Sequence, residues 1–343
     1  MRPKTFLAFV GPSLAMMLAF IAVPLWLVLW QSLHVTSGVF VEQKVETCTP
    51  GFPAQTCTEE LRQVPLMRDG RPVTETRFAG LENYRLMLQP EAVARAFAPG
   101  GGGLSEVLDI DFWKALRFTL TFTLLTLPFV LGIGLGLALA VESLARAWRG
   151  PVIFVTLLPY VITPVIGALS IRWLFVGDGI LTAALRAVTG TEITVFAHGW
   201  ATEVLMLFYR VWHVAPFAFV VFYAGLQTVN KDTLESAIID GASRFERLRY
   251  VVLPHLMPLI VFVTLIHLMD AYRVFEEVVG FSSQAYRISL QWLTYSLLTP
   301  DNAGNRAIPR ASASAMLTMV GIVLLLVPVL MRTWRDHRRA RAR

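Results

Sequence analysis

Six long apolar stretches alternate with polar segments along the chain. A helix needs about 20 apolar residues to cross the hydrocarbon core of a bilayer, and in lipid only helices and closed barrels satisfy their own backbone polar groups. The pattern therefore predicts an all-α membrane protein with six transmembrane helices, at residues 6–33, 116–141, 152–175, 203–226, 256–279 and 311–331.

Prolines lie inside several of these stretches. A proline removes a backbone donor from a helix, and a membrane span tolerates this where neighbouring helices satisfy the freed carbonyl. We therefore expect kinked helices in a packed bundle, with the kinks near Pro12, Pro24, Pro128, Pro159, Pro164 and Pro216.

Composition and charge predict how the chain is oriented in the membrane. Only 16% of the 343 residues are charged, against roughly 25% in soluble domains. Short cytoplasmic loops carry an excess of lysine and arginine. Both termini are therefore predicted to be cytoplasmic, because the basic residues lie at the N-terminus, between spans two and three, between spans four and five, and in the tail at 332–343.

The two ends of the chain each allow another interpretation. The apolar run within residues 1–33 resembles a signal peptide, but it is longer than the usual core of about 7–15 residues, so we expect it to be retained as the first span. The arginine-rich tail at 332–343 resembles tails that bind nucleic-acid phosphates. Because it directly follows a span, a topology anchor beside membrane lipid is favoured over nucleic-acid binding.

Residues 34–113 form the largest polar segment, which this topology places outside the membrane. It holds the two cysteines of the chain, Cys48 and Cys57, and ends in the glycine run 100–103. An oxidising compartment would allow the cysteines to form a disulfide, and two free thiols are the alternative. A zinc site is not expected, because the segment near the cysteines has no histidine.

The inner loop at residues 230–255, between spans four and five, has a helical pattern. Apolar positions recur at steps of three and four, which gives one apolar stripe formed by Leu234, Ala237, Ile238, Gly241, Ala242, Phe245 and Leu248. A passive amphipathic helix on the membrane surface is one interpretation of this pattern.

The residues of the same loop also resemble a known family. Glu235-Ser-Ala237-Ile-Ile-Asp240-Gly241-Ala, followed by Leu253-Pro254, is similar to the coupling loop of permeases from binding-protein-dependent ABC importers. Ser236 and Val251 stand where the family has alanine and isoleucine, and both changes conserve size. The Asp-Gly-Ala extension is typical of the carbohydrate branch.

The resemblance covers most of the chain, including the segments 78–84, 112–116, 149–173, 212–217 and 224–227. Residues 281–284, Phe-Ser-Ser-Gln, stand where the family often has a Gly-Gly-Pro turn, so the outer loop there is expected to differ. What the resemblance implies is a type I ABC importer permease, with 114–331 as its core, in a bacterial inner membrane.

The resemblance also implies roles and partners. Glu235 would offer its charge to an ATPase arginine, Gly241 would end the coupling helix, and Leu253 and Pro254 would start span five. Implied partners are a second permease, two ATPase subunits and an external solute-binding protein. The family's translocation pathway maps onto residues of spans four and five, namely His213, Phe217, His267 and Asp270.

The chain itself is not expected to be an enzyme. A phosphate-binding loop needs Gly-Lys-Ser/Thr, and none of the four lysines follows a glycine. We therefore expect no cofactor or metal in this chain, with ATP and Mg²⁺ in the partner ATPase.

Other interpretations of the polar residues remain. Asp270 and Arg273 are three residues apart and would pair on a helix, without any role in transport. An ion-gradient-driven secondary transporter would use Asp270, Arg273 and Glu276 as a proton relay, although no internal symmetry is evident. A membrane scaffold leaves the charges within spans unexplained. The carried solute would be a di- or oligosaccharide, a polyol or a glycerol phosphate.

Overall fold

The computed structural model describes most of the chain, namely residues 3–49, 56–68, 71–177, 179–190, 195–300 and 306–341. It divides into two compact units. Unit 1 comprises Met1–Gln89 with Leu297–Met316, and unit 2 comprises Pro90–Ser296 with Leu317–Arg343.

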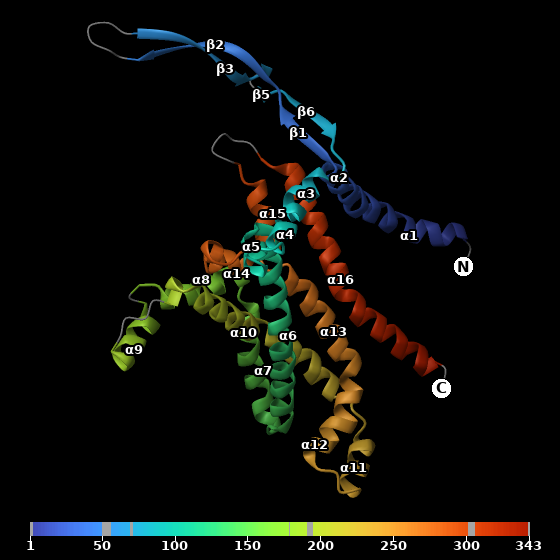
Figure 1. Cartoon of the computed structure of the whole chain (residues 1–343). Helices are drawn as coiled ribbons and strands as arrows, with labels where there is room; N and C mark the ends of the chain where they lie inside the picture. The colour runs from blue at the N-terminus through green and yellow to red at the C-terminus, as the bar shows by residue number, and fades with distance from the viewer. Residues whose placement is uncertain are drawn as a thin grey trace. The chain divides into compact units, whose positions relative to one another are not determined.

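Unit 1 begins with helical segments α1 (Pro3–Met17) and α2 (Val23–Ser32), which a π-helical turn at Leu18–Ala22 joins. Six strands follow, in three antiparallel pairs: β1–β6, β2–β3 and β4–β5. The β2–β3 pair forms a long ribbon (Figure 1). The strands are β1 (His34–Gly38), β2 (Phe40–Thr49), β3 (Thr56–Pro65), β4 (Met67–Arg68), β5 (Arg71–Pro72) and β6 (Thr74–Phe78).

Helix α3 (Glu82–Leu88) packs at the junction between α2 and β1. The side-chain amide of Asn83 donates hydrogen bonds of 2.9 Å to the carbonyls of Ser32 and His34. The hydroxyls of Ser32 and Tyr84 lie 2.7 Å apart. These buried contacts fix the point where the first span ends and the strands begin.

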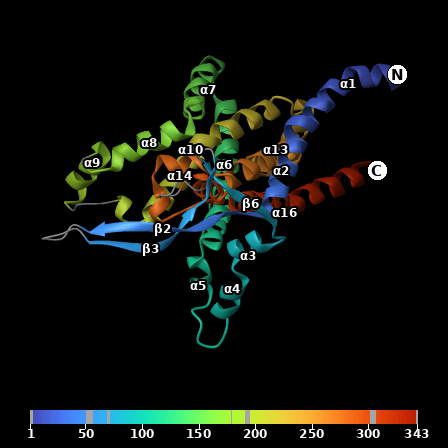
Figure 2. The same ribbon diagram turned by 90° about the horizontal axis from the view of Figure 1, so that it is seen from above.

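Unit 2 is helical, and α6 and α10 lie side by side at its centre (Figures 1 and 2). Its helices, with the last two shared with unit 1, are α4 (Pro90–Ala96), α5 (Leu104–Asp109), α6 (Asp111–Ser143), α7 (Arg146–Val161), α8 (Pro164–Phe175), α9 (Ile180–Thr189), α10 (Gly199–Leu226), α11 (Lys231–Ile239), α12 (Arg244–Arg247), α13 (Leu253–Tyr272), α14 (Glu276–Gly280), α15 (Leu290–Leu298) and α16 (Ile308–Arg341).

The core of unit 2 forms where α6, α10 and α13 pack against one another. Phe219 and Phe222 of α10 are fully buried there, with Val130 of α6 and Val263 of α13. Gly134 permits the closest approach of α6 to α10, because a Cβ at this position would lie 2.6 Å from the Cβ of Ala218. Small residues allow this kind of backbone approach in membrane bundles.

The predicted six-span helical fold is confirmed. Within the described part of the chain, six segments are long and apolar enough to cross a membrane: Phe9–Ser32, Asp111–Ser143, Pro164–Thr189, Gly199–Leu226, Arg244–Tyr272 and Ile308–Arg335.

Two spans, the third and the fifth, differ from the prediction by more than about five residues. The stretch 152–175 is not one helix, because α7 and α8 are separated by extended backbone at Ile162 and Thr163. A residue before proline is disfavoured in helical geometry, which explains the break before Pro164. The fifth span ends at Tyr272 rather than at 279, and a new helix, α14, begins at Glu276.

We predict that Gly134→Ala lowers the melting temperature of the detergent-solubilised protein, because the added methyl group meets the backbone of α10. Overpacking of this kind costs about 1–3 kcal/mol. Gly132→Ala is the matched control on the same helix, since no atom lies within 4 Å of a Cβ there. Equal melting temperatures for the two variants would contradict the close packing of α6 and α10.

Candidate functional site

The inner loop begins with a short capped helix, α11. The side chain of Asn230 accepts a hydrogen bond of 2.8 Å from the backbone amide of Asp232. At the other end Gly241 has a φ of +76°, and the amide of Ala242 donates to the carbonyl of Ala237 at 2.9 Å. This is a Schellman motif, in which a left-handed glycine ends the helix.

The chain then turns into α12 and continues towards the fifth span. A capping box starts α12: the Ser243 hydroxyl accepts from the amide of Glu246 at 3.3 Å, and the Glu246 carboxylate accepts from the amide of Ser243 at 2.7 Å. The resemblance implied that Leu253 and Pro254 start span five, and the structure differs: α12, a π-helical turn at Leu248–Val252 and α13 form one helix from Arg244 to Tyr272. The backbone stays helical at Val252, and the amide of Leu253 donates to the carbonyl of Leu248.

The predicted single stripe from residue 234 to 248 is therefore wrong as a continuous helix. Gly241 divides it into two helices, because its left-handed backbone cannot continue an α-helix.

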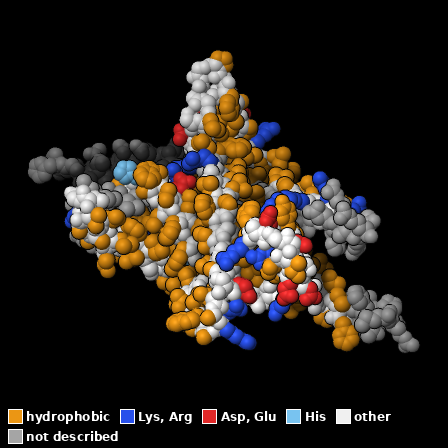
Figure 3. Space-filling view, turned by 90° about the horizontal axis from the view of Figure 1, so that it is seen from below, with side chains coloured by type: hydrophobic (Ala, Val, Ile, Leu, Met, Phe, Trp, Pro, Cys, Tyr) orange, Lys and Arg blue, Asp and Glu red, His pale blue; other side chains and the backbone are white. Residues whose placement is uncertain are grey.

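The loop presents both charged and apolar side chains to its surroundings. Glu235 and Asp240 are exposed, whereas Ala237 is half-buried. Ile239 and Phe245 are 85% and 72% exposed. Figure 3 shows acidic and basic side chains gathered on this largely hydrophobic side of the molecule. Large apolar side chains that stay exposed beside charges are typical of a surface that binds another protein.

A second polar cluster lies in the N-terminal half of α10, around Arg210. The guanidinium of Arg210 donates to the carboxylate of Glu277 at 2.8 Å and also pairs with Asp270. The side chains of Arg210 and Glu277 are 5% and 0% exposed, whereas that of Asp270 is 57% exposed. Arg210 thus joins three helices, because Asp270 belongs to α13 and Glu277 to α14.

The two histidines of the predicted pathway lie beside this cluster and are buried. Nε2 of His213 lies 2.9 Å from the carbonyl oxygen of Ile162, which the break between α7 and α8 leaves without a helical donor. Nε2 of His267 lies 2.9 Å from the Thr126 hydroxyl on α6. Both imidazoles therefore hold neighbouring helices in place.

Phe217 lies near the same region and is half-buried. Its ring is stacked on that of Tyr160, with 5.9 Å between the centroids. His267 and Asp270 lie one turn apart on α13, and His213 follows Arg210 by one turn on α10, with Phe217 one turn further along. The sequence did not connect Arg210 with Glu277, because the two residues belong to different helices.

The Arg210 pairs change the interpretation of Asp270. The pairing of Asp270 with Arg273 was one alternative, and instead the Asp270 carboxylate binds a guanidinium on another helix. Arg273 and Glu276, the other members of the proposed proton relay, are exposed. Within the described residues, no group of three or more potential metal ligands is present.

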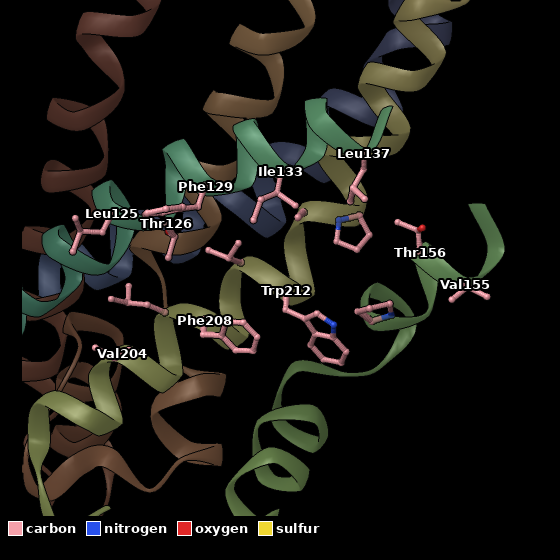
Figure 4. A pocket seen from close by; sticks show the side chains of 15 residues that line it. Leu125, Thr126, Phe129, Ile133, Leu137, Val155, Thr156, Val204, Phe208 and Trp212 are labelled. Atoms are coloured by element: carbon pink, nitrogen blue, oxygen red, sulfur yellow. The ribbon is translucent and has the colours of Figure 1, made fainter. Parts of the chain in front are cut away.

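A cavity of about 570 Å³ opens between α6, α7 and α10. Phe129, Phe208 and Trp212 contribute large apolar surfaces to it (Figure 4). The hydroxyls of Thr126 and Thr156, which also line it, donate to carbonyls of their own helices at 2.8 Å. Walls of this kind offer almost no hydrogen bonds, so the cavity is unsuited to a polyhydroxylated solute.

The disulfide candidates Cys48 and Cys57 lie in unit 1. Their backbones are directly paired in the β2–β3 ladder. Their side chains lie outside the part of the chain that the structure describes, so the disulfide stays a prediction.

We predict that Glu277→Gln destabilises the protein far more than Asp270→Asn. Removing one charge of a buried pair costs about 3–5 kcal/mol, and the loss of Asp270 costs less because its carboxylate is exposed and Glu277 still pairs with Arg210. Melting temperatures in detergent measure the difference. The double variant Arg210→Met, Glu277→Leu should recover stability relative to Glu277→Leu alone, and failure to recover would contradict the pairing.

Comparison with known proteins gives this arrangement a context. The chain is 31% identical over 209 residues to the trehalose transport system permease protein SugA of Mycobacterium tuberculosis, covering 60% of this chain and 59% of that protein. The chain therefore spans less than two thirds of the length of that relative. It is 25% identical over 285 residues to the trehalose/maltose transport system permease protein MalF of Thermococcus litoralis, covering 80% and 86%.

A solved structure shares the fold. A chain from a bacterial ABC transporter involved in the import of the acidic polysaccharide alginate superposes with a TM-score of 0.58 at 21% identity, covering 74% of this chain and 91% of that one. The family model of the binding-protein-dependent transport system inner membrane component matches residues 118–341, which is more than half of the chain. This multi-pass membrane protein therefore belongs to the family of binding-protein-dependent transport system inner membrane components.

Proposed function

We propose that this chain is the permease subunit of an ATP-driven ABC importer for a carbohydrate. The observation that carries the proposal is the exposed α11–α12 loop, in which Gly241 ends one helix and a capping box starts the next. A short rigid helix between two spans can act as a lever, because a force applied to it is transmitted to both α10 and α13.

The energy would come from partner proteins. The proposed assembly contains a second permease, two ATPase subunits that hold ATP and Mg²⁺, and an external solute-binding protein. Glu235 supports the docking role, because it is exposed on α11 and offers a carboxylate to a cationic partner. The exposed Ile239 and Phe245 would add apolar contact area. Both termini would be cytoplasmic, on the same side as this loop.

The relatives are named as transport system permeases for trehalose and for trehalose and maltose, which supports a carbohydrate as the solute. Asp270 is the member of the Arg210 cluster that is accessible, so its carboxylate would accept hydrogen bonds from solute hydroxyls. His213 and His267 would position the helices around it through their buried hydrogen bonds. Phe217 would offer an aromatic face beside Tyr160.

Affinity purification from native membranes in mild detergent tests the assembly directly. We expect an ATPase and a second permease to co-purify. Recovery of this chain alone after cross-linking, or uptake that follows a proton gradient without ATP hydrolysis, would contradict the proposal.

For the docking role, we predict that Glu235→Lys reduces the amount of co-purified ATPase by about tenfold, which corresponds to roughly 1.4 kcal/mol of lost binding. Insertion into the membrane should be unchanged. The control is Thr233→Lys, which adds a lysine at an exposed position of the same helix. Normal ATPase recovery and transport with Glu235→Lys would remove this residue from the interface.

For the pathway, we predict that Asp270→Ala impairs solute uptake while the assembly purifies intact. The measurement is uptake of labelled trehalose and maltose into proteoliposomes that contain the purified complex. Arg273→Ala, an exposed neighbour, is the control. If a sugar is transported and Asp270→Ala leaves its rate and half-saturating concentration unchanged, Asp270 does not contact the solute.

A further inference from the structure

The β2–β3 ribbon of unit 1 is long for a pair of strands. Ten residue pairs, from Phe40 opposite Pro65 to Thr49 opposite Thr56, form its ladder. At roughly 3.3 Å per residue it extends about 30 Å. Within the described strands, β2 and β3 pair only with each other. An isolated two-stranded hairpin is marginally stable in water, so this ribbon needs another source of stability.

The charged residues of the ribbon lower its expected stability further. Glu46 lies directly opposite Glu59 in the ladder, and Glu60 follows on β3. Like charges directly opposite each other destabilise an antiparallel pair. This pair lies three ladder positions from Thr49 and Thr56, the last paired residues at the tip.

The next pair on the same face is Cys48 opposite Cys57. Directly opposed residues of an antiparallel pair have Cα atoms about 4.5–5.5 Å apart. A disulfide requires about 4.4–6.8 Å between Cα atoms, so the backbone register alone satisfies this requirement. Two cysteines in the whole chain, both in one ladder position, leave each with the other as its intramolecular partner.

We propose that Cys48 and Cys57 form a disulfide that closes the tip of the ribbon and holds the strands together against the Glu46–Glu59 repulsion. The inference rests on the outer location of residues 34–113 under the proposed function. Formation of the S–S bond removes two protons and two electrons from the two thiols. A thiol oxidase of the external compartment receives them when its own disulfide is reduced to two thiols.

The first experiment counts thiols on intact cells, or on spheroplasts for an outer-membrane-bearing host. The probe is a membrane-impermeant maleimide carrying polyethylene glycol, applied to the full chain before and after a reducing agent. We expect no mass shift before reduction and a shift of two labels after it. Cys48→Ser and Cys57→Ser should each give one label without reduction.

Three results would overturn part of the inference, and they are distinguishable. Two labels without reduction mean free external thiols, which contradicts the disulfide but leaves the topology intact. Labelling only after permeabilisation contradicts the outer location and with it the proposed topology. A reducible band at twice the mass of the chain means an intermolecular bond instead.

A second experiment tests what the bond does. Trypsin should cleave the ribbon at Lys44 and Arg62 at least fivefold faster in the double variant Cys48→Ser, Cys57→Ser than in the parent. Thr49→Ser, Thr56→Ser alters the neighbouring ladder pair and should leave the rate unchanged. Equal cleavage rates for parent and cysteine double variant would show that the bond does not stabilise the ribbon.

Discussion

Backbone hydrogen bonding inside the membrane is the constraint on which the rest of this structure depends. A polar backbone group in lipid costs several kcal/mol when it has no partner, so every interruption of a span needs a compensating donor. The break between α7 and α8 shows how the chain meets this requirement. His213 reaches the carbonyl of Ile162, which lies in the break, and the Tyr209 hydroxyl donates to the carbonyl of Pro164 in the first turn of α8 at 2.8 Å. The histidine supplies the donor that the break requires, and the tyrosine ties the start of α8 to α10.

The same constraint applies to charge. Arg210 is buried among apolar helices, and it persists there because Glu277 and Asp270 neutralise it from two other helices. The two carboxylates differ in solvent exposure: the side chain of Glu277 is buried and that of Asp270 is exposed. The guanidinium of Arg210 therefore forms a buried pair with Glu277 and also binds the accessible carboxylate of Asp270. The pairing thus holds Asp270 in position while its carboxylate stays accessible.

The inner loop, by contrast, is stabilised by interactions between residues that are close in sequence. Caps at Asn230 and Ser243 and the left-handed Gly241 define α11 and α12 within the loop itself. Apolar side chains that would normally pack against a core, such as Ile239, are left exposed. A locally rigid element with an unsatisfied apolar surface is suited to bind a partner and to transmit its movement to the adjoining spans.

The sequence by itself determined the class of fold, the number of spans and the position of the inner loop, because these depend on apolar length, local caps and motif spacing. The family resemblance correctly marked Gly241 as a helix end, whereas Leu253 and Pro254 lie inside the helix from Arg244 to Tyr272. Pro164 marked the interruption between α7 and α8. Tertiary structure alone decided which donor reaches the carbonyl at that break, and which carboxylate pairs with Arg210. Those outcomes depend on side chains from helices that are distant in sequence, such as His213 with Ile162 and Arg210 with Glu277, and periodicity along one helix carries no information about its neighbours.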